Sequence, residues 1–377
     1  SASKSGEAKR NPILSFKMIL SAREIEPTLA LKLSRSVDPT STLTHGDALV
    51  LYLAYIDQLV RAAIAAEPLL PADAADSPRR LTSPLWRANT DIGRTVGRLI
   101  EEASVVSAEL GPAFAVSHIV PMSKALEALQ RARAAPAKGN FEGIVFEAHS
   151  AASAYAAFAR AKADHLLVID IGAGTTDFAG FESNRDGRTL SEITEARQWC
   201  ALAGDEIDNI VMELFMRASG GGGMDAKGHL WRALRLAAQD LKREIFVKGK
   251  AVFEHGPRRI TVRREALMND ASFKAFGRAL AHAIAESLKP VAERAKRAGS
   301  RRIKVLLAGG GSALPFLADL LKGCTTTTGL TLEVEPFGTN WALPYQHHPL
   351  SGAFPQLAIS MGGALAAIEP AYAPQTV

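Results

Sequence analysis

Apolar side chains that recur every three or four positions predict several helices in this chain. The clearest spans residues 45–66, where Leu49, Leu53, Ile56 and Val60 fall on one stripe. Thr44 precedes this stripe and Asp47 stands three residues later, which is the sequence of a capping box. Further helices are predicted at 91–107, 121–134, 148–162, 204–216, 229–246, 267–297, from 315 onward and at 358–368.

Short apolar or alternating runs between these helices predict strands. The runs at 166–169 and 304–307 are almost wholly apolar, as expected for strands buried on both faces of a sheet. Other strands are predicted at 81–86, 113–120, 141–146, 178–183, 190–199, 251–254, 259–262 and 331–335. Because strands and helices alternate along the chain, the pattern indicates an α/β fold.

The buried run at 166–169 leads directly into a polar turn. Two acids frame this turn, and small or hydroxyl residues fill it: Asp170, Gly172, Ala173, Gly174, Thr175, Thr176 and Asp177. Glycine lets the backbone approach phosphate oxygens, so that consecutive N–H groups converge on an anion. Carboxylates there can hold Mg²⁺ through its waters or orient an attacking water. We therefore interpret 170–177 as a phosphate and metal site, the alternative being an ordinary β-hairpin turn.

A second buried run, at 304–307, also ends in small residues: Gly309, Gly310, Gly311 and Ser312. Two strands that end in glycine turns, each framed by helices, are typical of an α/β protein with two related lobes facing one ligand. In such sheets the ligand lies beyond the carboxyl ends of the strands. A simple strand-to-helix turn is the alternative explanation for these glycines.

Composition and charge narrow the classes of protein. The chain has 377 residues, 47% apolar and 22% charged, which suits a globular protein of two or more domains. Two cysteines without metal-type spacing favour a reducing, cytoplasmic location, and the longest apolar run near the N-terminus, 48–56, is too short to span a membrane. A formal charge of +5 in scattered clusters, with 6% aromatic residues, argues against nucleic acid as the main ligand.

Several short segments follow the order of motifs in a known ATPase family. DIGAGTTD at 170–177 and AGGGSALP at 308–315 resemble the second phosphate motif and the adenosine motif of the seventy-kilodalton heat-shock chaperones, in the actin-like ATPase superfamily. Glu147 with AHSAASAY is similar to the helix that hinges the two lobes of that family. Further likenesses are AGD at 203–205 with IDN at 207–209, LRLAAQDLKR at 234–243, and SFKMIL at 15–20. The resemblance covers residues 11–369.

The resemblance implies a ribonuclease H-like, actin-like ATPase fold, in which two lobes with mixed sheets face a nucleotide cleft. It implies ATP or ADP with Mg²⁺ as the ligand. The catalytic side chains would be Lys17, Glu147, Asp170 and Thr175, and the metal would be held, through water, by Asp170, Asp177 and Glu147. The nucleotide would contact Gly172, Ala173, Gly174, Thr175, Thr176, Gly204, Asp205, Gln239, Lys242, Arg243, Gly309, Gly310, Gly311 and Ser312.

Physical reasons support several of these residues, and each has a plainer alternative. Lys17 is a charge inside an apolar segment, where a phosphate would supply the counter-charge, but a lysine can also snorkel to the surface. Glu147 precedes a helix and could simply cap it. Lys242 and Arg243 lie three and four positions after Gln239 and share a helix face with it, which is also expected of a solvated charge stripe. Asp177 could tie the turn together.

The chain also departs from the family pattern. Only sixteen residues precede Lys17, and they contain no Asp-Leu-Gly-Thr-Thr-like turn. We therefore expect a first lobe at 1–163 that lacks its leading strands and carries an insertion near 105–140. A second lobe would span 164–369, with a tail at 370–377 and no substrate-binding domain. Ala313 and Gln356 stand where the family commonly has an arginine and an acid.

Three functional hypotheses follow. The leading one is a chaperone-type nucleotide switch that binds Mg·ATP between two lobes, with hydrolysis that is weak or depends on the missing strands or on a co-chaperone-like protein partner. The second is a non-catalytic, actin-like scaffold or assembly subunit. The third is a small-molecule kinase or polyphosphate hydrolase of the same superfamily. A hydrolase triad is disfavoured because no serine stands in a nucleophile-elbow context.

Overall fold

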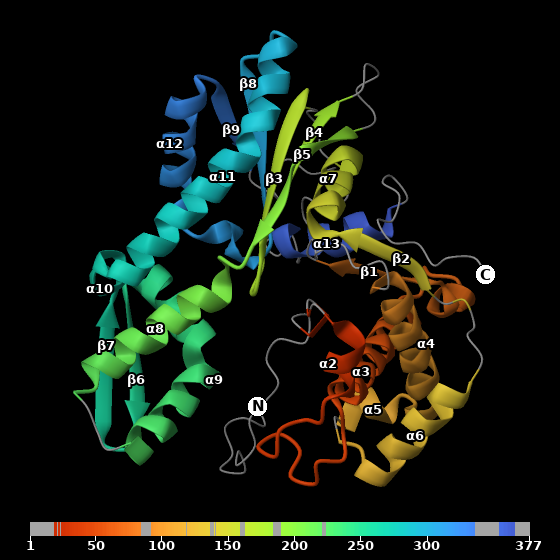
Figure 1. The fold of residues 1–377 in the computed structure, drawn as a ribbon. Helices are drawn as coiled ribbons and strands as arrows, with labels where there is room; N and C mark the ends of the chain where they lie inside the picture. The colour runs from red at the N-terminus through yellow and green to blue at the C-terminus, as the bar shows by residue number, and fades with distance from the viewer. Residues whose placement is uncertain are drawn as a thin grey trace. The chain divides into compact units, whose positions relative to one another are not determined.

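The chain forms two compact units (Figure 1). The computed structural model describes residues 19–20, 22, 24–83, 92–117, 119–135, 139, 141–158, 163–183, 190–220, 224–335 and 354–365. Unit 1 comprises Ser1–Phe146 with Glu369–Val377, and unit 2 comprises Glu147–Ile368. The expected boundary at residue 163 differs from this one by helix α7 (Glu147–Phe158), which packs on the sheet of unit 2.

The described part of unit 1 is mainly helical. Its helices are α2 (Ile25–Ala30), α3 (His45–Ala65), α4 (Ile92–Leu110), α5 (Ala113–Ser117) and α6 (Met122–Ala134), with a short 3₁₀ helix, η2 (Ala72–Asp76). Strands β1 (Arg79–Ser83) and β2 (Phe141–Phe146) pair in parallel. Leu49, Val96, Leu99 and Leu129 belong to one buried cluster, which joins α3, α4 and α6.

The predicted capping box at the start of α3 is confirmed. The Thr44 hydroxyl accepts a hydrogen bond from the Asp47 N–H at 3.1 Å, and the Asp47 carboxylate accepts one from the Thr44 N–H at 2.8 Å. These two bonds satisfy donors that a helix N-terminus otherwise leaves open. The local sequence therefore determines where α3 begins.

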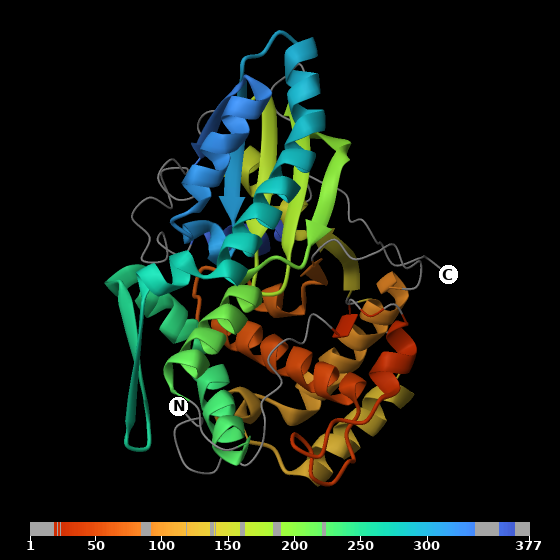
Figure 2. The ribbon, with the colours of Figure 1, turned by 60° about the vertical axis from the view of Figure 1, so that its left-hand side comes forward.

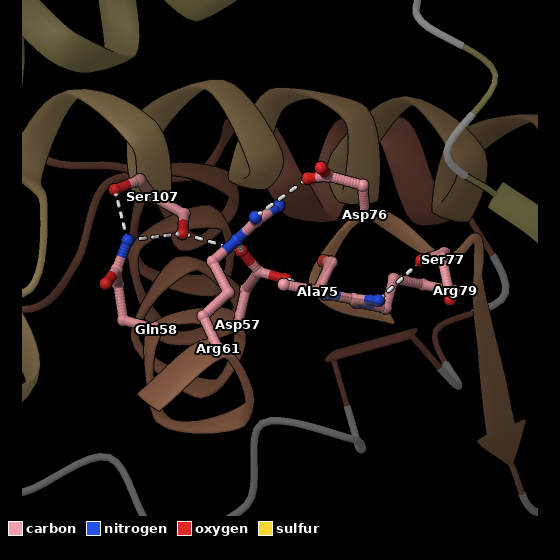
Figure 3. A network of polar contacts seen from close by, with 8 residues as sticks. All are labelled: Asp57, Gln58, Arg61, Ala75, Asp76, Ser77, Arg79 and Ser107. Carbon is pink, nitrogen blue, oxygen red and sulfur yellow. Dashed lines mark hydrogen bonds and ion pairs between the residues drawn. The ribbon is translucent and has the colours of Figure 1, made fainter. Parts of the chain in front are cut away.

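Helix α3 is long and apolar enough, by length and composition, to cross a membrane. Asp57 lies in its middle, however, and accepts hydrogen bonds from Arg61, Arg79 and Ser107, which tie α3 to β1 and α4 (Figure 3). Burial raises the pKa of Asp57, but these hydrogen bonds outweigh it and hold the pKa below its ordinary value. Leu49 and Ala54 of α3 are buried in unit 1, whereas Ile56 and Val60 of the predicted stripe are each 38% exposed, so α3 is only partly covered by the described residues.

The strand predicted at 113–120 is wrong, because residues 113–117 form helix α5. Gly111 adopts φ +66° after the end of α4, and Pro112 follows it with a φ that suits a first helical turn. One turn of helix buries Ala115 and brings Phe114 against the Tyr55 ring, 5.6 Å between centroids. Apolar residues alone do not distinguish such a short helix from a strand.

Unit 2 is built on a mixed five-stranded sheet in the order β5-β4-β3-β8-β9. Strands β3 (His165–Ile171), β4 (Thr176–Ser183) and β5 (Leu190–Cys200) form an antiparallel meander. Strands β8 (Arg302–Ala308) and β9 (Thr331–Glu335) continue the sheet parallel to β3. All seven residues of β3 are buried, as its apolar run predicts. The α/β class expected from the sequence is confirmed.

Helices cover both faces of this sheet. Helices α7 and α13 (Phe354–Ala364) pack against Leu166 and Val168 on one face. On the other face, Leu167, Ile169 and Ile171 share a core with α11 (Ala271–Arg297) and α12 (Leu317–Thr328). Figure 2 shows α11 and α12 in front of the strands. Alternate residues of β3 therefore face different helices, so Asp170 lies on the α7 side.

A smaller part of unit 2 extends away from this sheet (Figures 1 and 2). It contains α8 (Gly204–Ala218), α9 (Met224–Lys248) and the hairpin of β6 (Lys250–His255) and β7 (Arg258–Arg263), followed by α10 (Arg264–Asn269). Phe215 of α8 packs edge-on against Phe253 of β6, with centroids 6.2 Å apart. The inner side of the hairpin, with Ile260 and Val262, belongs to the main core of unit 2.

Candidate functional site

The two glycine turns predicted from the sequence lie side by side. Strand β8 pairs in parallel with β3, with Asp170 beside Ala308 in register. The turn at 172–175 and the turn at 309–312 therefore follow the carboxyl ends of neighbouring parallel strands. Ligands of α/β sheets bind at this edge. Both turns belong to unit 2.

Gly309 brings the second turn directly against the first. Its φ is +76°, a conformation that side chains disfavour. A Cβ at this position would overlap the Asp170 Oδ1 atom and the Ile171 carbonyl oxygen. Gly311 is similarly close, because a Cβ there would overlap the Ile171 side chain. Glycine at these two positions allows the backbone after β8 to lie on the end of β3.

Asp170 and Asp177 face one another across the antiparallel pair of β3 and β4. Both carboxylates are buried, with 3% and 2% exposure. Directly opposite residues of an antiparallel pair project from the same face of the sheet, where like charges are destabilising. A bound cation would offset this repulsion, so the arrangement suits a metal ion.

The turn between these acids is closed by its own hydrogen bonds. The Gly172 N–H donates to the Thr175 carbonyl at 2.9 Å, and the Thr175 hydroxyl donates to Asp177 Oδ2 at 3.0 Å. The Thr176 hydroxyl donates to the Leu202 carbonyl at 2.6 Å. Asp177 and Thr176 thus hold the turn in place, while Ala173 at its tip is exposed.

Helix α8 begins at the same turn. The Gly204 N–H donates to the Gly172 carbonyl at 3.1 Å, and the Asp205 N–H donates to the Ala173 carbonyl at 2.7 Å. The resemblance assigns both residues to a nucleotide, but here their N–H groups are bonded to the turn. Gly204 and Asp205 therefore position the turn in this structure.

Lys242 of α9 is held between two groups of α8. Its ammonium donates to the Gly204 carbonyl at 3.1 Å and pairs with Asp208 Oδ1 at 2.9 Å. Burial raises the pKa of Asp208, and Lys242 lowers it again in part. Gln239 and Arg243 of the same helix are exposed. Of the three α9 residues predicted to contact the nucleotide, the described contacts bring Lys242 to Gly204, which bonds to the glycine turn.

The other predicted site residues take different places. Glu147 is 6% exposed and forms the first residue of α7, the helix that covers the Asp170 face of the sheet. Gly310 and Ser312 lie in the short helix η3 (Gly310–Ala313), and the Ser312 N–H donates to the Gly309 carbonyl at 3.2 Å. Gly174 is half-buried in the first turn. Lys17 lies outside the described residues.

A polar network that the sequence did not indicate lies toward the other end of the same sheet, because Glu192 pairs with Phe181, which pairs with Leu166 near the start of β3. His149 Nε2, in the first turn of α7, lies 2.7 Å from Glu192 Oε1 on β5, and Arg197 also pairs with Glu192. Burial raises the pKa of Glu192, but the hydrogen bonds from Arg197 and His149 outweigh it and lower the pKa to about 2. No local pattern could have found this network, because it joins residues of α7 to an edge strand.

The donor set for a metal is limited. Among the described residues, no three His, Cys, Asp or Glu side chains are grouped so that they could hold a metal ion. Asp170 and Asp177 with the Thr175 hydroxyl supply oxygen atoms, which Mg²⁺ prefers. The residues therefore fit an Mg²⁺ that keeps several waters and is completed by phosphate oxygens.

Comparison with known proteins does not identify a family. No protein-family model matches this chain, and no curated protein sequence matches it either.

Proposed function

We propose that the paired glycine turns of unit 2 bind the phosphates of Mg·ATP or Mg·ADP, and that the chain is a nucleotide switch of the chaperone type with an actin-like fold. The observation that carries the proposal is the contact of Gly309 with Asp170 at the carboxyl ends of β3 and β8. It joins the two segments that resemble the phosphate and adenosine motifs. The mixed sheet is of the kind that the resemblance implies.

Each residue of the site has a role in this proposal. The exposed tip of the first turn offers backbone N–H groups to phosphate oxygens. Asp170, with Asp177 opposite, would hold the water shell of Mg²⁺, which neutralises phosphate charge when bound. Thr175 orients Asp177, and Lys242 places a positive charge beside Gly204. Glu147 would orient water from the start of α7, and Lys17 stays a predicted phosphate contact.

A charge added at the tip of the turn tests the site. We expect isothermal titration calorimetry to show Mg·ATP binding to the unmodified chain. Ala173→Glu should weaken this binding at least about tenfold, because a carboxylate would repel the phosphates. Ala298→Glu is the matched control, since Ala298 is also exposed but follows α11, just before β8 begins. Absence of binding at millimolar ATP, or equal loss in both variants, would contradict the proposal.

A non-catalytic scaffold is the second candidate. It is favoured by the internal bonding of the site, in which the turn and Asp208 already engage Gly204, Asp205 and Lys242. Single-turnover hydrolysis of ATP separates the two candidates. A switch that hydrolyses ATP should lose most of its rate in Asp170→Asn while still binding nucleotide, whereas a scaffold should show the same background rate in both forms.

A further inference from the structure

The positive charge of this chain is concentrated in one segment of unit 2. Residues 224–264 hold eleven of the 44 Lys and Arg but four of the 39 Asp and Glu, so they carry a formal charge of +7. The rest of the chain, with 33 Lys and Arg against 35 Asp and Glu, carries −2. This segment forms α9, the β6–β7 hairpin and the start of α10. The nucleotide site uses Lys242 of this set.

The outer face of the β6–β7 hairpin presents several of these cations. Ile260 and Val262 of β7 are buried against the core, and the alternate residues Arg259, Thr261 and Arg263 are exposed. Because side chains alternate along a strand, these three share the outer face. They stand in register with Glu254, Val252 and Lys250 of β6.

These charges are poorly compensated within the chain. Lys250 and Arg263 are directly opposite, and like charges in that relation are destabilising. Among the described residues, Glu254 is the acid that pairs with this face. Its Oε1 atom lies 3.8 Å from Arg259 Nε, and both side chains are 73% exposed. An exposed pair at that distance contributes little. An anionic partner would relieve the repulsion.

The geometry favours an extended protein segment over nucleic acid. In the described structure β6 and β7 pair with each other and with no third strand, so one edge of β7 has no strand beside it. Such an edge can pair with an added strand. Val252, Thr261 and Glu254 interrupt the cations, which suits a protein segment with mixed side chains. Nucleic-acid affinity depends on the number of phosphates that Lys and Arg neutralise, and this face offers only Lys250, Arg259 and Arg263 among the described residues of the hairpin.

We propose that the outer face of the hairpin binds an acidic, extended segment of a protein partner, which adds along β7 as a third strand. Arg259 and Arg263 recognise its carboxylates. These two arginines are four residues apart on one face, so the segment carries acids four residues apart. The surface is separate from the nucleotide site and does not depend on the proposed function.

Two synthetic peptides of identical composition test this geometry. Each contains valine, threonine and two glutamates. In one peptide the glutamates stand four residues apart and share a face of a strand, and in the other they stand three apart and face opposite sides. We expect the first peptide to bind at least about fivefold more tightly in fluorescence anisotropy at low salt. Equal affinities would overturn strand addition.

Paired charge reversals test the location. Arg259→Glu with Arg263→Glu should weaken binding of the first peptide at least about tenfold. Arg232→Glu with Arg235→Glu is the control, because it makes the same charge change at exposed positions of α9. Equal loss in both would show a net-charge effect and overturn the proposal, as would tighter binding of single-stranded DNA of the same length. The comparison of the two peptides uses the unmodified protein, so it tests the proposal even if a charge-reversal variant fails to fold.

Discussion

At the scale of single residues, the site depends on Gly309 having no side chain. Its backbone has φ +76°, and the space where a Cβ would lie is filled by the Asp170 carboxylate and the end of β3. A side chain at this position would therefore suffer conformational strain from the positive φ and steric overlap with the end of β3. Glycine avoids both the strain and the overlap, and mutation can measure the two costs separately.

Gly309→Ala should destabilise unit 2 more than the same change at a glycine with equal strain and free space. Gly299 has φ +72° and no atom within 4 Å of an added Cβ, so Gly299→Ala should cost about 1–2 kcal/mol from strain alone. Gly309→Ala should cost roughly 1–3 kcal/mol more, because the chain must move away from Asp170. Urea unfolding of both variants measures the difference. Equal losses would show that the two turns are not in close contact.

At the scale of elements, α7 is held in place by one contact with strand β5 and one with helix α13. His149 in its first turn contacts Glu192 of β5. One turn of α13 also approaches it so closely that a Cβ at Gly362 would overlap the Ser150 carbonyl group. Because Glu147 begins α7, these contacts fix where the backbone of Glu147 lies.

The Glu192 contact should make stability depend on pH. A pKa lowered to about 2 in the folded state means that Glu192 stabilises the fold above its ordinary pKa, and that this stability is lost as pH falls toward 2. Glu192→Gln should therefore destabilise the protein by about 1–2 kcal/mol at pH 7, after allowance for solvent screening, and by less at pH 3. Glu195→Gln, at a side chain that is 63% exposed, should change little. Thermal unfolding at both pH values checks this, and a pH-independent difference would contradict it.

The contact of α13 with α7 predicts opposite effects at two helical glycines. Gly362→Ala should destabilise unit 2 by about 1–3 kcal/mol, because α13 must move off the start of α7. Gly323→Ala in α12, where no atom lies within 4 Å, should stabilise it by about 0.5–1 kcal/mol through the higher helix propensity of alanine. Denaturant unfolding of both variants measures the sign of each change in the free energy of unfolding. Stabilisation by Gly362→Ala would rule out the close packing.

The local sequence pattern predicts most helices and strands of this fold, but not which of them pack or pair with one another. The apolar run of β3, the capping box of α3 and the strand at β2 follow from neighbouring residues, and the structure confirms them. The pairing of β3 with β8 joins segments far apart in the chain, so periodicity could not predict it. The same holds for Lys242 with Asp208, and for the N–H groups of Gly204 and Asp205, which bond to the turn. The prediction of a strand at α5 is wrong because the few apolar residues there have no clear period.

At the scale of the whole molecule, the chain separates a helical unit 1 from a unit 2 that carries most of the predicted site. The glycine turns, Asp170, Asp177, Glu147 and Lys242 all belong to unit 2, while Lys17 precedes the described part of unit 1. Cytoplasmic location and a co-chaperone-like partner stay predictions. The central claim concerns the two turns of unit 2 as one binding site for Mg·ATP.

Hydrogen exchange of the intact protein tests that claim most directly. Backbone exchange would be followed by mass spectrometry with and without millimolar Mg·ATP. The proposal predicts slower exchange with Mg·ATP in peptides that cover 170–177 and 308–313 together, since the phosphates would order both turns. Unchanged exchange in both turns, or protection confined to other segments, would contradict it.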